Sequence, residues 1–196
     1  MNAIEKRIQF IVEADKLKAI LRQSTLIYDR NQRENDAEHT WHLTLCALLL
    51  AEHIATEGQV DLLRVLKMLI IHDMVEIEAG DTYCYDEAGY LDKVQREREA
   101  ATSLFSTLPR EQYDEFMDLW EEFEEMATVE AKYAAAIDRL QPVLQIYYYD
   151  GNTWLENNIE VERELKRNEV IKEIMPEVWD YVRKLIDDAV NKGWLK

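Results

Sequence analysis

The stretch LKMLIIHDMVEIEAGD, residues 66–81, decides how this chain folds. It opens with a nearly continuous apolar run, and an adjacent histidine and aspartate, His72 and Asp73, interrupt that run. Such a run predicts a helix that the core of the protein buries. A buried histidine and aspartate cost free energy unless each has a partner or a metal. The stretch therefore predicts a buried polar site.

An acidic residue extends this site along the same helix. Glu76 follows His72 by four residues and Asp73 by three, so a helix places the three side chains on one face. A loop rich in tyrosine and acidic residues follows over residues 81–90. We expect this loop to border the site.

Two residues elsewhere in the chain complete a candidate set of metal ligands. His39 lies in DAEHTWH, residues 36–42, and Asp138 lies in AAAIDRLQP, residues 134–142. Together with His72 and Asp73 they could hold one divalent metal. Two imidazoles and two carboxylates suit Mn, Co, Ni, Fe or Zn, and they leave positions open on a six-coordinate ion. Water at such a position has a lowered pKa and can attack a phosphorus atom held by the same ion.

Composition predicts an all-α fold in a single domain, residues 1–196. The chain is 47% hydrophobic and has no stretch rich in Pro, Gly or Ser that would serve as a linker. With 5 Gly and 3 Pro, and with long stretches at helical spacing, it reads as a helical bundle with little room for strands. The expected helices are residues 2–22, 36–57, 60–78, 91–107, 110–126, 129–149, 158–172 and 176–192.

Two local features refine this expectation. Asp36 is the expected N-cap of the second helix. Pro142 lies four residues after Asp138, so it cannot donate the backbone hydrogen bond that the Asp138 carbonyl would normally accept. We expect a kink there, which either aims Asp138 inward or bends the helix around the core.

The charge distribution limits the partners. A net charge of −17 argues against nucleic acid or an anionic membrane as the main partner. Residues 111–130 are strongly acidic, and their regularly spaced aromatic residues predict a helix with one solvated face. Residues 16–33 are basic instead, although they belong to an acidic protein. A small phosphorylated substrate needs a cation that it can reach, and Arg22 is the candidate.

The cysteines and the termini bear on location. Cys46 and Cys84 form neither a CxxC motif nor a disulfide framework, so a reducing compartment is adequate. Charged residues interrupt residues 1–25, which argues against a signal peptide, and residues 43–51 are too short to span a bilayer. We expect a cytoplasmic protein.

The set His39, His72-Asp73 and Asp138 resembles the HD-domain metal-dependent phosphohydrolases, and within them the small 5′-deoxynucleotidase-like group. The similarity runs from about residue 14 to the C-terminus. The matching stretches are Leu17-Lys18…Arg22, Arg33-Glu34-Asn35…Glu38-His39, Ile71-His72-Asp73…Glu76…Gly80-Asp81, Lys93…Glu99-Ala100, Leu119 to Glu124, Glu130-Ala131-Lys132 and Ile137-Asp138-Arg139-Leu140.

The resemblance implies a fold, a reaction and residue roles. It implies an HD-type helical bundle in which His39, His72, Asp73 and Asp138 hold one divalent metal. Glu76 would accept or orient the proton of the attacking water, and Asp81 would orient the nucleophile or serve the leaving oxygen. Arg22 would neutralise charge on the phosphate. The implied reaction cleaves a (deoxy)nucleoside 5′-monophosphate to nucleoside and phosphate, in a homodimer.

Two departures from the group's pattern concern the substrate. Gln23, Ser24 and Thr25 follow Arg22, where those enzymes have a tryptophan that helps to read the sugar. We therefore expect weak discrimination between deoxy and ribo sugars. The loop after Asp81 lacks the proline-containing sequence common in the group, which leaves another small phosphoester open as the substrate.

Two other classes of protein compete with the phosphohydrolase interpretation. A di-iron oxidoreductase needs Glu-x-x-His pairs, and none of the 4 histidines has Glu three residues before it. A catalytically inactive HD fold that serves as a ligand-binding or scaffold protein stays as the alternative, although all the expected ligands are present. His42, three residues after His39, is expected to support the site or to pack beside it.

Overall fold

The computed structural model describes residues 1–29, 31–56, 58–82 and 91–196 of the chain. Within these ranges the fold is helical apart from one two-stranded antiparallel sheet, as the sequence predicts. Most of the acidic, tyrosine-rich loop expected to border the site, including Cys84, lies outside the described residues.

The elements follow one another along the chain in this order. They are α1 (Ala3–Ala14), η1 (Asp15–Ala19), β1 (Leu21–Thr25), β2 (Arg33–Asn35), α2 (Asp36–Leu50), η2 (Ala51–His53), α3 (Leu62–Ile71), η3 (His72–Val75), α4 (Glu76–Ala79), α5 (Lys93–Phe105), α6 (Arg110–Glu125), α7 (Val129–Tyr148), α8 (Asn152–Asn157), α9 (Val161–Arg167), α10 (Glu169–Ile174) and α11 (Pro176–Asn191).

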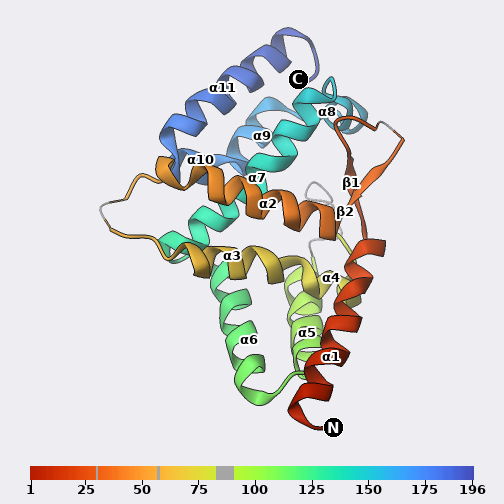
Figure 1. Ribbon diagram of the computed structural model, residues 1–196. Coiled ribbons are helices and arrows are strands. Elements are labelled where there is room, and N and C mark those ends of the chain that lie inside the picture. Colours follow the sequence, from red (N-terminus) through yellow and green to blue (C-terminus); the bar gives the residue numbers. More distant parts are fainter. Residues whose placement is uncertain (30, 57, 83–90) are drawn as a thin grey trace.

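Helix α7 is the central element. It packs against α2, α3, α6 and α10, and its alanines at 134–136 are buried, which lets those helices approach closely. Helices α2 and α3 cross the middle of the molecule, with α8 to α11 on one side and α1, α5 and α6 on the other (Figure 1). The helix continues through Pro142, and the buried hydrophobic residues form one cluster around it.

The acidic stretch forms the expected helix with one solvated face. In α6, Leu119, Trp120 and Phe123 are buried, and the acidic residues lie on the remaining surface. The last predicted helix is also confirmed, as α11. The stretch predicted as a helix over 158–172 is instead divided into α9 and α10 at Asn168, whose side-chain amide donates to the Glu164 carbonyl (2.9 Å).

The predicted first helix is too long. It ends at Ala14, a 3₁₀ turn follows, and Leu21–Thr25 pairs with Arg33–Asn35 as a hairpin. Residues 15–22 contain no Gly or Pro that would end a helix, and tertiary pairing of the backbone prevails over their local propensity. The consequence for the site is that Arg22 lies on a strand.

Two further boundaries differ from expectation at the site. The helix expected over 60–78 divides into α3, the 3₁₀ turn η3 and α4, so the His72-Asp73 pair begins a tight turn; such interruptions often accompany functional sites. The N-cap of α2 is Asn35 and not Asp36: Asn35 exchanges hydrogen bonds with Glu38 in a capping box. Asp36 is the first residue of the helix, and its side chain contacts Arg22 instead.

Candidate metal centre and pocket

The four expected ligands converge from three elements. His39 extends from the first turns of α2, His72 and Asp73 from η3, and Asp138 from the middle of α7. His39 Nε2 lies 3.0 Å from Asp138 Oδ1 and 3.9 Å from Asp73 Oδ2. His72 Nε2 lies 3.1 Å from Asp73 Oδ1 and 3.7 Å from Asp138 Oδ1. Two ring nitrogens and two carboxylates thus face one point.

These donors fit a divalent metal. His72 Nδ1 donates to the Leu69 carbonyl oxygen (2.9 Å), so Nε2 is the nitrogen that faces the other ligands. This buried Nε2 atom has no hydrogen-bond partner among the residues that the structure describes. An imidazole fixed through one nitrogen by a backbone carbonyl, with the other directed at carboxylates, is the usual state of a metal-binding histidine.

The charges of the metal-free site depend on one another. Burial would lower the pKa of His72, but the carboxylates of Asp73 and Asp138 raise it to about 9. Burial disfavours the charged form of Asp138, yet the neighbouring imidazoles of His39 and His72 hold its pKa well below the usual value. The metal-free protein therefore keeps a proton on His72 at neutral pH, which a metal would displace.

Two further carboxylates lie beside the ligand Asp73: Asp36, Asp73 and Glu76 each offer an oxygen within 4.8 Å of the others. Arg22 Nη1 donates to Asp73 Oδ2 (2.8 Å) and Asp36 Oδ1 (3.3 Å). Burial, then Asp73 and Asp36, raise the pKa of Glu76 to about 11. Glu76 is therefore protonated at neutral pH in the metal-free protein, and a divalent cation would favour its carboxylate form.

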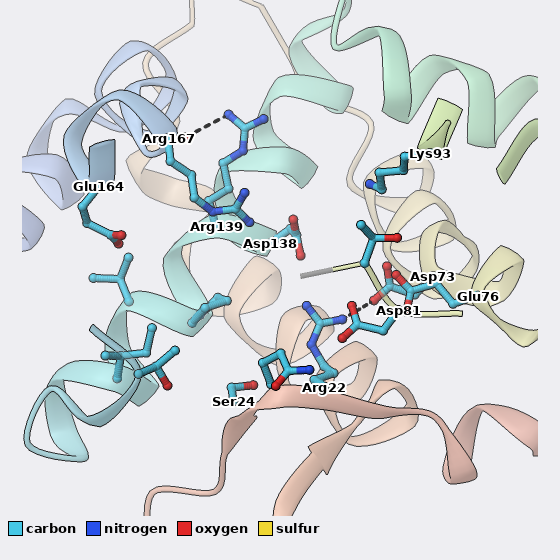
Figure 2. A pocket seen from close by; sticks show the side chains of 16 residues that line it. Arg22, Ser24, Asp73, Glu76, Asp81, Lys93, Asp138, Arg139, Glu164 and Arg167 are labelled. Atoms are coloured by element: carbon cyan, nitrogen blue, oxygen red, sulfur yellow. Dashed lines mark hydrogen bonds and ion pairs between the residues drawn. The ribbon is translucent and has the colours of Figure 1, made fainter. Parts of the chain in front are cut away.

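A pocket with an empty volume of about 820 Å³, part of it open solvent, connects these groups. At its carboxylate end lie Arg22, Asp73, Glu76, Asp81, Lys93 and Asp138. At its far end lie Glu164 and Arg167, and Pro142, Val143, Ile146 and Thr153 also line the pocket. Figure 2 shows Glu164 and Arg167 on the opposite side of the pocket from Asp73, Glu76 and Lys93. The structure thus brings every site residue expected from the sequence, except the two buried histidines, to the wall of one pocket.

Burial raises the pKa of the Asp81 carboxyl, while Arg22 opposes that rise. Lys93 extends from the start of α5, and its ammonium group lies 3.4 Å from the buried carboxylate of Glu97. Because Lys93 lines the pocket near Asp81, it places a second cation at the carboxylate end.

Several residues of the site could not be found from the pattern of ligands. Asp36 and Glu34 are buried carboxylates, and Gln141 lies one residue before Pro142 in the same helix as Asp138. In the sequence, Glu34 and Gln141 could have been suspected because they are polar residues close to the motifs that contain His39 and Asp138. His42 has the expected supporting position, since its Nδ1 lies 3.2 Å from Gln141 Nε2.

A helical core in which two histidines and two aspartates converge beside a pocket lined by acidic and basic side chains defines the class of protein as one with a metal site. The family model for the HD domain matches residues 14–179. The chain belongs to the HD-domain family, which confirms the resemblance drawn from its sequence.

Similar proteins of known name or structure share this fold. A crystal structure from Magnetospirillum magnetotacticum MS-1, described as a predicted metal-dependent phosphohydrolase, is 44% identical and superposes with a TM-score of 0.91, over 98% of this chain and 95% of that one. The 5′-deoxynucleotidase HDDC2 of Dictyostelium discoideum is 28% identical, over 79% of this chain and 84% of that protein. The 5′-deoxynucleotidase hdd1 of Schizosaccharomyces pombe is 25% identical, over 100% of this chain and 90% of that protein.

Proposed function

We propose that this HD-domain protein hydrolyses nucleoside 5′-monophosphates to nucleoside and phosphate in a metal-dependent reaction. The chain is a metal-dependent phosphohydrolase of the HD family. The observation that carries the proposal is the convergence of His39, His72, Asp73 and Asp138 on one point at the wall of a pocket that also holds Arg22.

In this proposal the four ligands hold one divalent ion, of Mn, Co, Ni, Fe or Zn. When bound, the ion would polarise a phosphate oxygen and lower the pKa of a water molecule. Glu76 receives or orients the proton of that water, and the burial that keeps its carboxyl from solvent holds it in place. Asp81 lines the same wall and orients the nucleophile or serves the leaving oxygen.

Arg22 neutralises charge that grows on the phosphate. Its guanidinium is held by Asp36 and Asp73 and lines the pocket, so it is positioned before a substrate arrives. Preorganised donors of this kind stabilise the transition state more than the ground state. The ammonium group of Lys93 adds a second positive charge at the same end of the pocket.

The far end of the pocket receives the nucleoside. Val143 and Ile146 follow Asp138 by five and eight residues on α7, so they extend the pocket by about 12 Å along the helix. They offer apolar contact, whereas Thr153, Glu164 and Arg167 offer polar groups. This mixture suits a sugar and a base. Ser24 lines the pocket where the 5′-deoxynucleotidase-like group has a tryptophan nearby, so we propose weak selectivity for the sugar.

The test is a hydrolysis screen on metal-stripped protein supplied separately with Mn, Co, Zn and Mg. The substrates are matched deoxy and ribo nucleoside 5′-monophosphates and simple phosphomonoesters. Release of phosphate from the nucleotides, with similar kcat/KM for each deoxy and ribo pair, supports the proposal. Tight metal binding without turnover of any phosphoester would instead support a ligand-binding or scaffold protein.

We propose a homodimer as the assembled form. Apolar side chains that are exposed in the single chain gather on two helices, Ile4, Ile8, Ile11 and Val12 on α1 and Trp41, Leu45, Leu48 and Leu49 on α2. Each set repeats at the spacing of one helical face, and contiguous exposed apolar surface marks interaction sites. Light scattering of the wild-type protein and of a Leu48→Glu/Leu49→Glu variant tests this: the variant is expected to be monomeric.

Two further parts of the proposal concern the location of the protein in the cell and its partners. None of the helices that the structure describes is both long and apolar enough to cross a membrane. We propose a cytoplasmic location, where the free thiol of Cys46 stays reduced. The net charge of −17 supports small phosphorylated molecules, and not nucleic acid, as the partners.

A further inference from the structure

A buried carboxylate lies behind His39, on the side away from Asp138. Glu34, in strand β2, is 1% exposed. Its Oε2 lies 3.4 Å from His39 Nδ1, and its Oε1 accepts hydrogen bonds from Gln141 Nε2 (2.8 Å) and Gln145 Nε2 (2.6 Å). No role in the reaction proposed above falls to this residue.

The carboxylate of Glu34 determines how the Gln141 amide is turned. An ionised carboxylate only accepts hydrogen bonds, so Gln141 must direct its NH₂ group at Glu34. Its Oε1 then faces the other way, 3.1 Å from His39 Nδ1. An amide oxygen only accepts, and therefore His39 must carry its proton on Nδ1.

This relay of contacts, from Glu34 through Gln141 to His39, sets the tautomer of a metal ligand. With the proton on Nδ1, the lone pair of the neutral His39 ring lies on Nε2, the atom 3.0 Å from Asp138 Oδ1. We propose that Glu34 is a positioning residue that, through Gln141, fixes His39 with its Nε2 lone pair directed at the metal site. The inference rests on the metal site of the proposed function.

The same carboxylate also reaches the neighbouring strand. Glu34 Oε2 accepts a hydrogen bond from Ser24 Oγ (3.3 Å), and it lies 3.8 Å from Arg22 Nε. Because Arg22 faces the pocket, Glu34 holds a metal ligand on one side and the proposed phosphate-binding cation on the other. Its removal is therefore expected to disturb metal binding first and phosphate binding second.

The first experiment needs no variant. Nitrogen-15 NMR of the histidine rings in the metal-stripped wild-type protein, at a pH high enough to neutralise His39, reports which nitrogen carries the proton. The relay predicts the Nδ1–H tautomer. Observation of the Nε2–H tautomer would overturn the proposal.

The second experiment measures metal affinity by competition with a chromophoric chelator. Glu34→Leu removes the acceptor, and loss of an outer partner of a metal-bound histidine lowers affinity roughly 10–100-fold. Glu34→Gln keeps an oxygen that can accept from Gln141, so it should recover most of that loss. Tyr133→Phe is the matched control, since it removes a buried hydrogen bond from α7, the helix that carries Gln141, to the Ala47 carbonyl in α2.

Circular dichroism establishes that each variant folds. A folded Glu34→Leu protein that binds metal as tightly as the wild type would reject the relay. If Glu34→Leu does not fold, the tautomer of His39 in the wild-type protein tests the proposal. Neither measurement uses catalysis. A protein that binds metal through an Nδ1–H His39 but hydrolyses no phosphoester would contradict the proposed function and leave this inference standing.

Discussion

The two ends of the pocket are built from different parts of the fold. The carboxylate end comes from β1, η3, α4, α5 and α7, and two of its aspartates, Asp73 and Asp138, contact two buried histidines in the core. The far end comes from the second half of α7 together with α8 and α9, short helices near the C-terminal side of the molecule. The carboxylate end suits chemistry, which needs fixed geometry, and the far end suits recognition, which tolerates variation.

The largest effect is expected at the carboxylate end, when two ligands are removed. A His72→Ala/Asp73→Ala variant should lose the bound divalent ion, and hydrolysis should fall to background. Metal content after dialysis and phosphate release measure the two effects. His53→Ala is the control, because His53 contacts Glu177 on another surface. Full metal stoichiometry in the double variant would remove these residues from the ligand set.

Glu76→Gln separates proton transfer from metal binding at the same end. The substitution keeps the volume of the side chain and removes its ability to act as a base, which typically costs roughly 10²–10⁴ in rate. Metal content and melting temperature should stay near the wild-type values, while kcat falls. Nearly unchanged turnover with metal bound would show that the buried carboxyl is structural.

Arg22→Ala removes the cation between two carboxylates. We expect a loss of about 2–4 kcal/mol in transition-state stabilisation, measured as kcat/KM. Arg22→Lys should recover only part of it, since Arg22 Nη1 contacts Asp36 and Asp73 and an ammonium group lacks the remaining donors of the planar guanidinium. Arg33→Ala is the matched control, an exposed arginine in the same hairpin. Equal kcat/KM in Arg22→Ala and Arg33→Ala would rule out the clamp.

The charges of the carboxylate end also predict a pH dependence of stability without metal. The pKa of His72 rises from 6.5 to about 9 on folding, so its contribution is complete below pH 6.5 and is lost as pH rises through 9. At about 1.4 kcal/mol per pKa unit, the loss is on the order of 3 kcal/mol. The raised pKa of Glu76 acts in the same direction.

Thermal unfolding of the metal-stripped protein between pH 6.5 and 9 tests this dependence. The melting temperature should fall across the range, and it should fall less in His72→Gln, which cannot hold the extra proton. Excess zinc should flatten the curve for the wild type, because metal displaces the proton from His72. A melting temperature that rises with pH in the metal-stripped wild type would contradict the assignment.

The smallest effect is expected at the far end. Arg167→Ala should raise KM for nucleotides roughly tenfold, about 1.4 kcal/mol, and leave kcat nearly unchanged, because Arg167 contacts the part of the substrate that does not react. Arg163→Ala, an exposed arginine on the same helix, is the control. A fall in kcat as large as that in Glu76→Gln would abolish the division of roles between the two ends.

The same division explains what the sequence could predict. His72 and Asp73 stand out because they interrupt an apolar run, His39, Asp138 and Glu76 follow from motifs in helical segments, and Asp81 follows from the family resemblance. All of them lie where the sequence analysis expects a shared site. The helix boundaries around them were less predictable, since η3 forms where the helix pattern continues unbroken in the sequence.

The far end gives no comparable signal. No sequence motif marks the residues of this end, and the tertiary packing of α7, α8 and α9 brings them together. They include Val143, Thr153, Glu164 and Arg167. Arg22 is an intermediate case: its chemistry was predictable, but its placement on a strand was not, because backbone pairing across a hairpin depends on a second strand farther along the chain. The role of Glu34 was not predictable for the same reason, since it depends on the position of the second strand.

The hairpin has a consequence for how this protein can change over generations. Arg22 and Glu34 lie next to the paired residues Leu21 and Asn35, at the base of the hairpin and against the buried site. The connection between the strands lies farther out, and loops of this kind tolerate insertions and deletions. New sequence at the tip would leave Arg22 and Glu34 where they are, because buried partners outside the connection hold both side chains. The hairpin can therefore change in length at its tip while the site keeps these two side chains.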